Sequence, residues 1–354
     1  MRRFSILLLK IAVSLAIIGF LVWQARHDNT FANLRDQPKQ WGMLVAAWFF
    51  CAAAVLTTIV RWHFLVRAVE IPARLTESLR IGFLGYMFNL APTGIVAGDA
   101  VKAIMLARAH ENSRARSIAS VVVDRLIGLY VLFIVATAAI WLTGFWRIED
   151  PMITQIRSAT YWVTAIGAAG IVALMIPAVT DGKLVRAMEQ WPRVGRVIAS
   201  LVDAMRMYRR RPGVLLAAAV MSVAVHSLFA AGIYCIARGL PASNMHSLGN
   251  HFVMSPLSSS TGVLPLPFGP FELVLDLLYA HVPIDGIPLP KGQGLVVALC
   301  YRIITVLIAA IGAFYFIGSR QEVARSIREA GDEEPIAPGS TIAMRRRCDP
   351  ASAA

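Results

Sequence analysis

Long apolar runs constrain the fold of this chain more than any other feature of its sequence. An α-helix needs about 20 apolar residues to cross a hydrocarbon core of about 30 Å. Stretches that approach or exceed this length are Phe4–Trp23, Trp41–Val60, Ile118–Trp146, Tyr161–Pro177, Val214–Ala237 and Leu295–Ile317. Only 16% of the residues are charged, whereas a soluble domain carries about 25%. The sequence therefore predicts an all-α polytopic membrane protein.

The first apolar run has two interpretations. It begins Met1-Arg2-Arg3, which is also typical of a secretory signal peptide. No small-x-small cleavage site follows it, and Lys10 interrupts its apolar stretch. We therefore expect an uncleaved membrane anchor.

Two further apolar stretches, Ile81–Gly98 and Phe252–His281, contain residues that interrupt a helix. The first includes Asn89, Pro92 and Gly94, and the second includes four prolines and two glycines. Proline lacks a backbone donor and clashes with the preceding turn, so neither stretch can form one continuous helix.

Lysine and arginine are unevenly distributed among the connecting segments. Of the 34 residues, 25 lie in 1–10, 61–80, 98–116, 183–211 and the tail after 318, seven lie in the other connections, and Arg125 and Arg302 lie within apolar runs. Short loops rich in these residues stay in the cytoplasm. We therefore expect six full transmembrane helices, cytoplasmic termini and two re-entrant broken-helix hairpins, Ile81–Gly98 from the inner face and Phe252–His281 from the outer face. Because the charge follows topology, the net charge of +13 does not indicate a nucleic-acid partner.

Both broken stretches precede a similar arrangement of charges. Asp99 is followed 26 residues later by Arg125, and Glu272 is followed 30 residues later by Arg302. We interpret this order as an inverted-topology repeat, with half-repeats at about 41–146 and 213–318 inside a membrane domain that spans 1–320. Residues 321–354 read as a disordered cytoplasmic tail.

Inverted repeats with interrupted helices are typical of transporters, because irregular backbone at membrane depth is tolerated only where it is buried or lines a cavity. The alternative is that the prolines only kink long helices that pack against their neighbours.

The two arginines inside apolar runs permit two readings. Arg125 lies about 13 Å along a helix beyond Arg116, well inside the membrane, and a charge there costs roughly 2.5–3.5 kcal/mol. In one reading, the residues Asp99, Asp124, Arg125, Glu272 and Arg302 form a buried ion network that holds the helices together. In the other, the arginines bind an anionic headgroup, since their planar donors suit a phosphate. Both can hold at once.

Lys102 follows Asp99 at helical i, i+3 spacing and shares its face, although a basic residue near a membrane edge often only sets topology.

The chain lacks a GxxxxGK[ST] loop and a zincin motif, and its four cysteines form no spaced pairs. We therefore expect no enzymatic activity, no cofactor, no metal site and no ATP hydrolysis.

The motifs resemble the transmembrane flippase-like domain of the lysylphosphatidylglycerol synthase family. The matching elements, over roughly residues 5 to 320, are Asn89-x2-Pro92, Gly98-Asp99-x2-Lys102, Ser120-Val121-x2-Asp124-Arg125-Leu126-x-Gly128, Pro265–Glu272 and Tyr301-Arg302. The family pattern favours Gly-Gly-Asp where this chain has Ala97-Gly98-Asp99, and arginine where it has Lys102. It also favours a glycine-richer turn before Glu272.

The resemblance implies an inner (plasma) membrane protein that moves a lipid. The lipid could be an anionic or aminoacylated phospholipid, a polyprenyl-linked sugar or a hopanoid-type lipid. It implies no synthase activity, because the chain ends before the soluble aminoacyltransferase domain of the full-length members. The candidate substrate-binding residues are Asn89, Asp99, Lys102, Asp124, Arg125, Glu272 and Arg302. Two alternatives stay open: a non-transporting scaffold that binds lipid beside a partner enzyme of envelope lipid synthesis, and a lipid-modifying enzyme, for which no nucleophile–base pair is evident.

Overall fold

The computed structural model describes residues 38–89, 95–110, 113–176, 206–240, 245–264, 268–284 and 291–332, with isolated positions between these ranges and some within 14–23. Within them every regular element is a helix, apart from one isolated bridge between Ile284 and Ile287. The predicted all-α class is thus confirmed for the described part of the chain.

Four of the described helices are long and apolar enough to cross a membrane. They are α3 (Trp41–Ala68), α6 (Arg114–Leu142), α11 (Pro212–Gly239) and α14 (Gln293–Asp332), whose apolar part is Gln293–Ile317. These helices coincide with four of the six predicted runs, so the chain has the helices of a multi-pass membrane protein.

The other two predicted spans differ from these four. Tyr161–Pro177 falls mainly in α7 (Pro151–Met175), which is not among the four apolar candidates. The helix begins where the carboxylate of Asp150 accepts hydrogen bonds from its first free backbone N–H groups. Most of Phe4–Trp23 lies outside the described residues. The count of six spans therefore stays a prediction.

Each of the two interrupted stretches forms a pair of shorter helices. The pairs are α4 (Leu75–Asn89) with α5 (Ile95–Ala109), and α12 (Leu248–Ser260) with α13 (Pro270–His281), the second pair having the 3-10 turn η2 (Thr261–Val263) between its helices. Pro256 is accommodated inside α12, so the second break comes later than this proline. The prediction that neither stretch is one continuous helix is confirmed.

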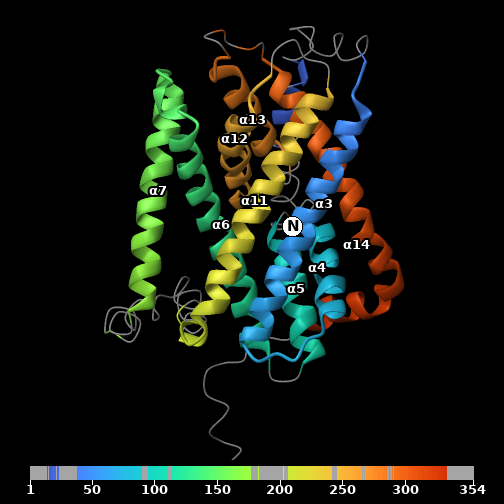
Figure 1. Cartoon of the computed structure of the whole chain (residues 1–354). Helices are drawn as coiled ribbons and strands as arrows, with labels where there is room; N and C mark the ends of the chain where they lie inside the picture. The colour runs from blue at the N-terminus through green and yellow to red at the C-terminus, as the bar shows by residue number, and fades with distance from the viewer. Residues whose placement is uncertain are drawn as a thin grey trace, which may run out of the picture.

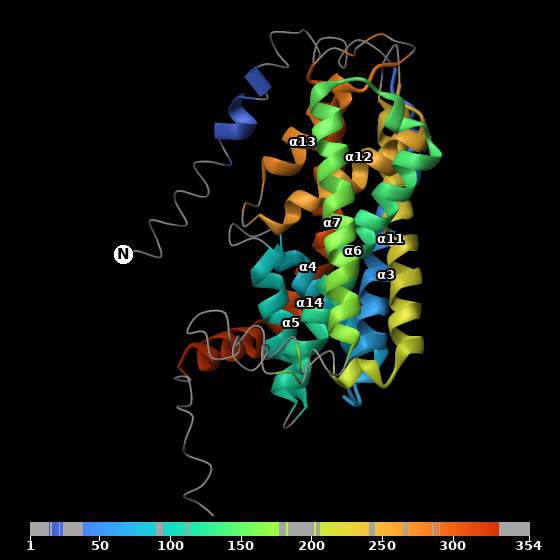
Figure 2. The ribbon, with the colours of Figure 1, turned by 90° about the vertical axis from the view of Figure 1, so that its left-hand side faces the viewer.

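The two helix pairs lie at opposite ends of the bundle. In Figures 1 and 2, α4 and α5 lie in the lower half and α12 and α13 in the upper half. Each pair also packs across the bundle, since α4 contacts α14 and α12 contacts α6. The long helices α3 and α11 lie side by side and form the most extensive contact between any two described helices.

The contact between α3 and α11 follows a reciprocal pattern. Both helices have 28 residues, with Cys51 and Ser222 at their eleventh positions and Arg61 and Gly232 at their twenty-first. A Cβ atom at Gly232 would lie 2.7 Å from Sγ of Cys51, and Nη1 of Arg61 donates to Oγ of Ser222 at 2.6 Å. The eleventh residue of each helix therefore meets the twenty-first residue of the other.

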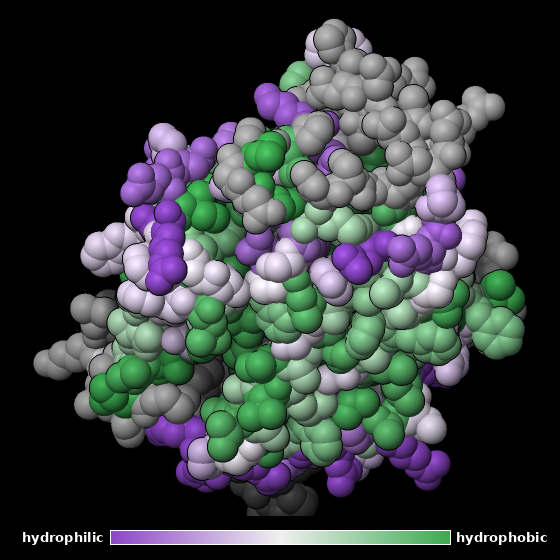
Figure 3. Space-filling model, turned by 45° about the horizontal axis from the view of Figure 1, so that its top comes forward, coloured by the Kyte–Doolittle hydropathy of each residue, from purple (hydrophilic) through white to green (hydrophobic). Residues whose placement is uncertain are grey.

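The outer surface carries large apolar side chains. Figure 3 shows hydrophobic residues over the flank of the molecule, with hydrophilic residues along its rims. Exposed members include Phe49, Leu142, Trp162, Ile166, Leu216 and Ile303. A surface of this kind is stable against lipid tails and would be a large apolar patch in water.

Helix α14 extends past the predicted end of the membrane domain at residue 320. Helix α14 continues through residue 321, where we expected the tail to begin, and ends at Asp332. The segment after residue 320 is rich in Ala, Arg and Glu, which favour helix and extend α14 beyond its apolar part. Residues 333–354 lie outside the described part of the chain.

A close approach of two backbones holds α4 against α5. A Cβ atom at Gly98 would lie 2.0 Å from the carbonyl oxygen of Gly85 and 2.1 Å from Oδ1 of Asn89. Only glycine fits there, because backbone atoms cannot move aside as a flexible side chain can. Gly98 thus brings Asp99 beside the end of α4.

We expect Gly98→Ala to destabilise the protein by at least about 1–3 kcal/mol, the usual cost of overpacking. The measurement is the thermal unfolding midpoint of the purified protein in detergent. Gly42→Ala is the matched control, because nothing lies within 4 Å of a Cβ atom placed at Gly42. Equal midpoints for the two variants would contradict the close approach.

Candidate functional site

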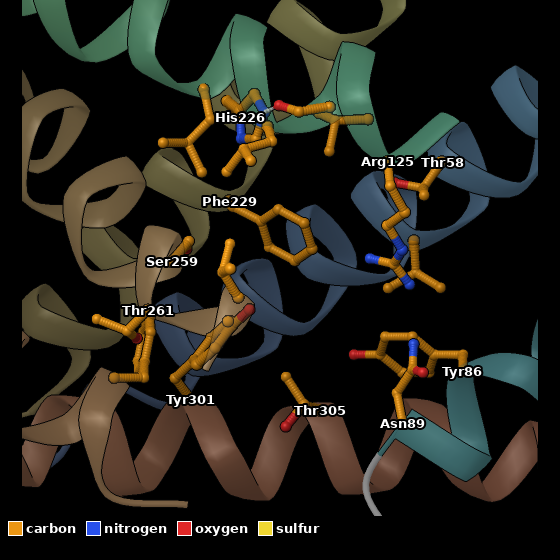
Figure 4. Close-up of a pocket in the computed structure, with 18 of the residues that line it drawn as sticks. Thr58, Tyr86, Asn89, Arg125, His226, Phe229, Ser259, Thr261, Tyr301 and Thr305 are labelled. Carbon is orange, nitrogen blue, oxygen red and sulfur yellow. Dashed lines mark hydrogen bonds between the residues drawn. The ribbon is translucent and has the colours of Figure 1, made fainter. Parts of the chain in front are cut away.

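A cavity of about 410 Å³ lies between the two helix pairs, and all four of the long apolar helices contribute to its wall. Its charged lining residues are Arg61, Lys102, Asp124, Arg125, Glu272 and Arg302. Figure 4 shows Arg125 reaching from one wall toward Tyr86 and Asn89, with Phe229 and Tyr301 farther along the same space. The cavity therefore combines ionised groups with aromatic and aliphatic surface.

The first ion pair joins α5 to α6. Nε of Arg125 donates to Oδ2 of Asp99 and Nη2 donates to Oδ1, both at 2.7 Å. This two-point contact is the strong geometry for an arginine and a carboxylate. The Arg125 side chain is still 41% exposed, and it lines the cavity.

The second ion pair joins α13 to α14. Nε and Nη2 of Arg302 donate to Oε1 of Glu272 at 3.0 and 2.6 Å, and Oε2 accepts from the backbone N–H of Gly269 at 2.8 Å. The Arg302 guanidinium also lies 5.0 Å from the ring centroid of Phe268. Glu272 is only 1% exposed, so its charge is compensated by these contacts rather than by solvent.

A third ion pair, which the sequence analysis missed, joins α3 to α6. Nε of Arg61 donates to Oδ1 of Asp124 at 2.9 Å, Nη1 donates to Ser222, and Nη2 donates to the Asp124 carbonyl at 3.3 Å. Arg61 and Asp124 are 4% and 3% exposed. We had counted Arg61 with the basic connecting segment 61–80, whereas α3 continues to Ala68 and carries this arginine inward. The apolar residues Trp62, Phe64, Leu65 and Val66 that follow Arg61 were the signal for this longer helix.

Lys102 is the fourth cation of the cavity, and it too had been counted with a connecting segment. It is 5% exposed, and its Nζ lies 5.4 Å from the ring centroid of Trp62. No carboxylate of the described residues lies within ion-pair distance of it. Without Arg61 and Lys102 the basic connecting segments still hold 23 of the 34 lysines and arginines, so the asymmetry behind the predicted orientation persists.

Asn89 ends α4 at the cavity wall. Its Oδ1 atom is buried and has no hydrogen-bond partner among the described residues. An unsatisfied buried amide oxygen costs roughly 1–3 kcal/mol, so such an atom at a cavity is a group that a ligand can satisfy.

The structure therefore brings the seven predicted site residues to one place. Six of them line the cavity, namely Asn89, Lys102, Asp124, Arg125, Glu272 and Arg302, and Asp99 holds Arg125. The acids and arginines form three separate pairs rather than the single network of the first sequence reading. With Lys102 the site has four cations and three carboxylates, which leaves one positive charge in excess.

Aromatic side chains also line the cavity. The rings of Phe271 and Tyr301 lie 5.0 Å apart, and those of Phe229 and Tyr301 lie 6.1 Å apart. Aliphatic residues such as Leu132 and Val225 continue this wall. Among the described residues, no three His, Cys, Asp or Glu side chains are grouped so that they could hold a metal ion. The site is thus equipped to hold an ion and apolar groups by contact.

Comparison with known proteins relates the chain to one membrane family. Residues 7–312 match the family described as the lysylphosphatidylglycerol synthase TM region. A UPF0104 membrane protein of Pyrococcus horikoshii is 29% identical over 123 residues, which is 34% of this chain and 36% of that protein. The match thus spans about a third of the relative's length. No solved structure shows a significant similarity to the chain.

We expect Asp124→Asn to destabilise the fold by about 3–5 kcal/mol, because it leaves Arg61 charged, buried and without a carboxylate. Asp99→Asn should cost less, since the Arg125 side chain is 41% exposed and can be hydrated from the cavity. Thermal unfolding midpoints of the two variants measure the difference. The double variant Arg61→Gln, Asp124→Asn should recover part of the loss, and a double variant as unstable as the sum of both single changes would count against this pairing.

Proposed function

We propose that this chain, which belongs to the lysylphosphatidylglycerol synthase TM region family, moves a lipid across the inner (plasma) membrane without an ATPase of its own. The single observation that carries the proposal is the cavity between the two helix pairs, where cations and an apolar wall face the same space. Such a cavity suits an amphipathic molecule with an anionic headgroup. An anionic, aminoacylated, polyprenyl-linked or hopanoid-type lipid is the class of cargo.

We propose further that the chain is an inverted-topology repeat with six full spans, two re-entrant hairpins and both termini in the cytoplasm. Three observations support the repeat. The helix pairs lie at opposite ends of the bundle, each packs on the long helix of the other half, and α3 and α11 meet through reciprocal positions. A repeat of this kind has two related conformations, in which the same site opens to one face or the other.

In this mechanism the ion pairs Asp99–Arg125 and Glu272–Arg302 hold each hairpin against the helix that follows it. Arg125 and Arg302 bind the headgroup alternately as the hairpins open. When the cargo leaves, the arginines form their ion pairs with Asp99 and Glu272 again. Each exchange replaces one anion by another around the same guanidinium, so no step leaves a bare charge inside the membrane. Asp124 keeps Arg61 neutralised throughout.

A second function, a non-transporting scaffold that binds lipid beside an enzyme of lipid synthesis, is favoured by one observation. Every described carboxylate of the site is already engaged by an arginine, as expected of pairs that only hold helices together. Under this alternative the charge-conserving change Arg125→Lys should be silent.

The transport proposal is tested with the protein reconstituted in phosphatidylcholine vesicles that contain fluorescently labelled phosphatidylglycerol. We expect the wild-type protein to expose inner-leaflet label to an external quencher, and Arg125→Ala or Arg302→Ala to fall to the rate of protein-free vesicles. Lys39→Gln, which removes a charge from the connection before α3, should keep the wild-type rate.

Unchanged transport in folded Arg125→Ala would remove the mechanism. Transport in no variant, together with lipid-dependent capture of one stable partner enzyme, would favour the scaffold.

A further inference from the structure

The two halves of the chain share a scaffold but differ in charge. Lys102 lies three residues after Asp99, and the residue three after Glu272 is Leu275, which is fully buried in the hydrophobic core. Arg61 corresponds in helix position to Gly232. The residue before Arg125 is an acid, Asp124, and the residue before Arg302 is a tyrosine. The charged residues that line the cavity beyond the shared pairs thus all belong to the first half.

The Lys102 side chain has a defined place in the wall of the cavity. Its methylene groups run across Gly85, where a Cβ atom would lie 2.7 Å from Cγ and 2.8 Å from Cε of the lysine. Its ammonium group then lies 5.4 Å from the ring centroid of Trp62, within the range of a cation–π contact. Gly85 and Trp62 therefore make room for this cation and hold it.

The charge balance singles out Lys102 among the cations of the cavity. Asp124 is engaged by Arg61, Asp99 by Arg125 and Glu272 by Arg302. Lys102 is 5% exposed and, among the described residues, has no carboxylate of its own. An ammonium group that is this deeply buried is stabilised when an anion binds beside it.

Two further groups converge on the same part of the cavity. Asn89, whose Oδ1 has no hydrogen-bond partner among the described residues, lies beside Gly98, one helical turn before Lys102. The accessible part of Arg125 faces Asn89 across the space in Figure 4. An oxyanion here would receive charged donors from Lys102 and Arg125, and the Asn89 amide could turn to donate as well.

We infer that Lys102 is the anchor of an oxyanion subsite in the first half of the cavity, and that this subsite takes the phosphate of the cargo headgroup. Arg125 and Asn89 complete the subsite, while the tails lie along the aromatic and aliphatic wall formed by Leu132, Val225 and Phe229. The subsite follows from the charges and geometry of the cavity, and the identification of its occupant as a lipid rests on the proposed function.

The test measures binding to the full chain in a non-ionic detergent, with dihexanoyl-phosphatidylglycerol and inorganic phosphate as separate probes. We expect Lys102→Gln to weaken phosphatidylglycerol binding at least tenfold and Lys102→Arg to stay within about threefold of the wild type. Lys39→Gln removes the same charge outside the cavity and should bind as the wild type does.

Comparison of the two probes identifies the source of the anion. Phosphatidylglycerol binding that is much tighter than phosphate binding, with both dependent on Lys102, supports a lipid headgroup. Equal affinities that both depend on Lys102 support the subsite with free phosphate as its ligand. Wild-type binding of both probes by folded Lys102→Gln would overturn the inference.

Asn89→Asp keeps the test decisive if Lys102→Gln fails to fold. This change places a carboxylate beside the lysine, and it should compete with the probe and weaken binding at least tenfold. Undiminished binding by this variant would also overturn the inference.

The vesicle assay separates this inference from the proposed function. If Lys102→Gln weakens probe binding but the wild-type protein moves no lipid, the transport proposal is refuted and the subsite is supported. If the wild-type protein moves lipid but Lys102→Gln binds the probes as the wild type does, the subsite is refuted and the transport proposal is supported.

Discussion

Ionised side chains inside an apolar bundle must be paired, and this requirement limits how the helices of the protein can pack. A guanidinium group at membrane depth is stable only beside a counter-charge or water. Here each of the three arginines at the cavity has one carboxylate, and each pair joins two different helices: α3 to α6, α5 to α6, and α13 to α14. The positions of the helices are therefore set partly by where their charges can be neutralised, because a shifted helix would leave a charge uncompensated.

The ion pairs Asp99–Arg125 and Glu272–Arg302 depend on the interruption of the helices that carry the two acids. A helix that ends beside the cavity presents its end and its acids to the interior, where a continuous helix would present only its side. Glu272 illustrates this, because it binds Arg302 and also accepts from the backbone N–H of Gly269 at the start of α13. Asp276, one turn later, accepts from the backbone N–H groups of Gly292 and Leu295 at the start of α14. Two acids on one short helix thus fix the neighbouring long helix.

The two proposed half-repeats differ in charge, so the two ends of the cavity differ as well. Without this difference, a repeat of two related halves would have no preference for either end of its cavity. Lys102 and the buried pair of Arg61 and Asp124 lie in the first half, whereas the second half has Leu275, Gly232 and Tyr301 at the related positions. An anion entering the cavity therefore meets two unequal ends, which is what a site needs if it is to orient an amphipathic molecule.

The amino-acid sequence alone predicted the apolar spans at α3, α6, α11 and α14, the interruption of two further stretches, and the order of acid and arginine in each proposed half-repeat. Proline acts on the turn before it, and a span is recognised from a window of about 19 consecutive residues, so neither signal requires knowledge of the tertiary contacts. The packing of the helices, in contrast, decided which acid binds which arginine, since the partners lie 26, 30 and 63 residues apart in the chain. It also decided that Arg61 and Lys102 are buried: a basic residue at the end of an apolar run reads as a topology signal, and only the packing of neighbouring helices draws it into the interior.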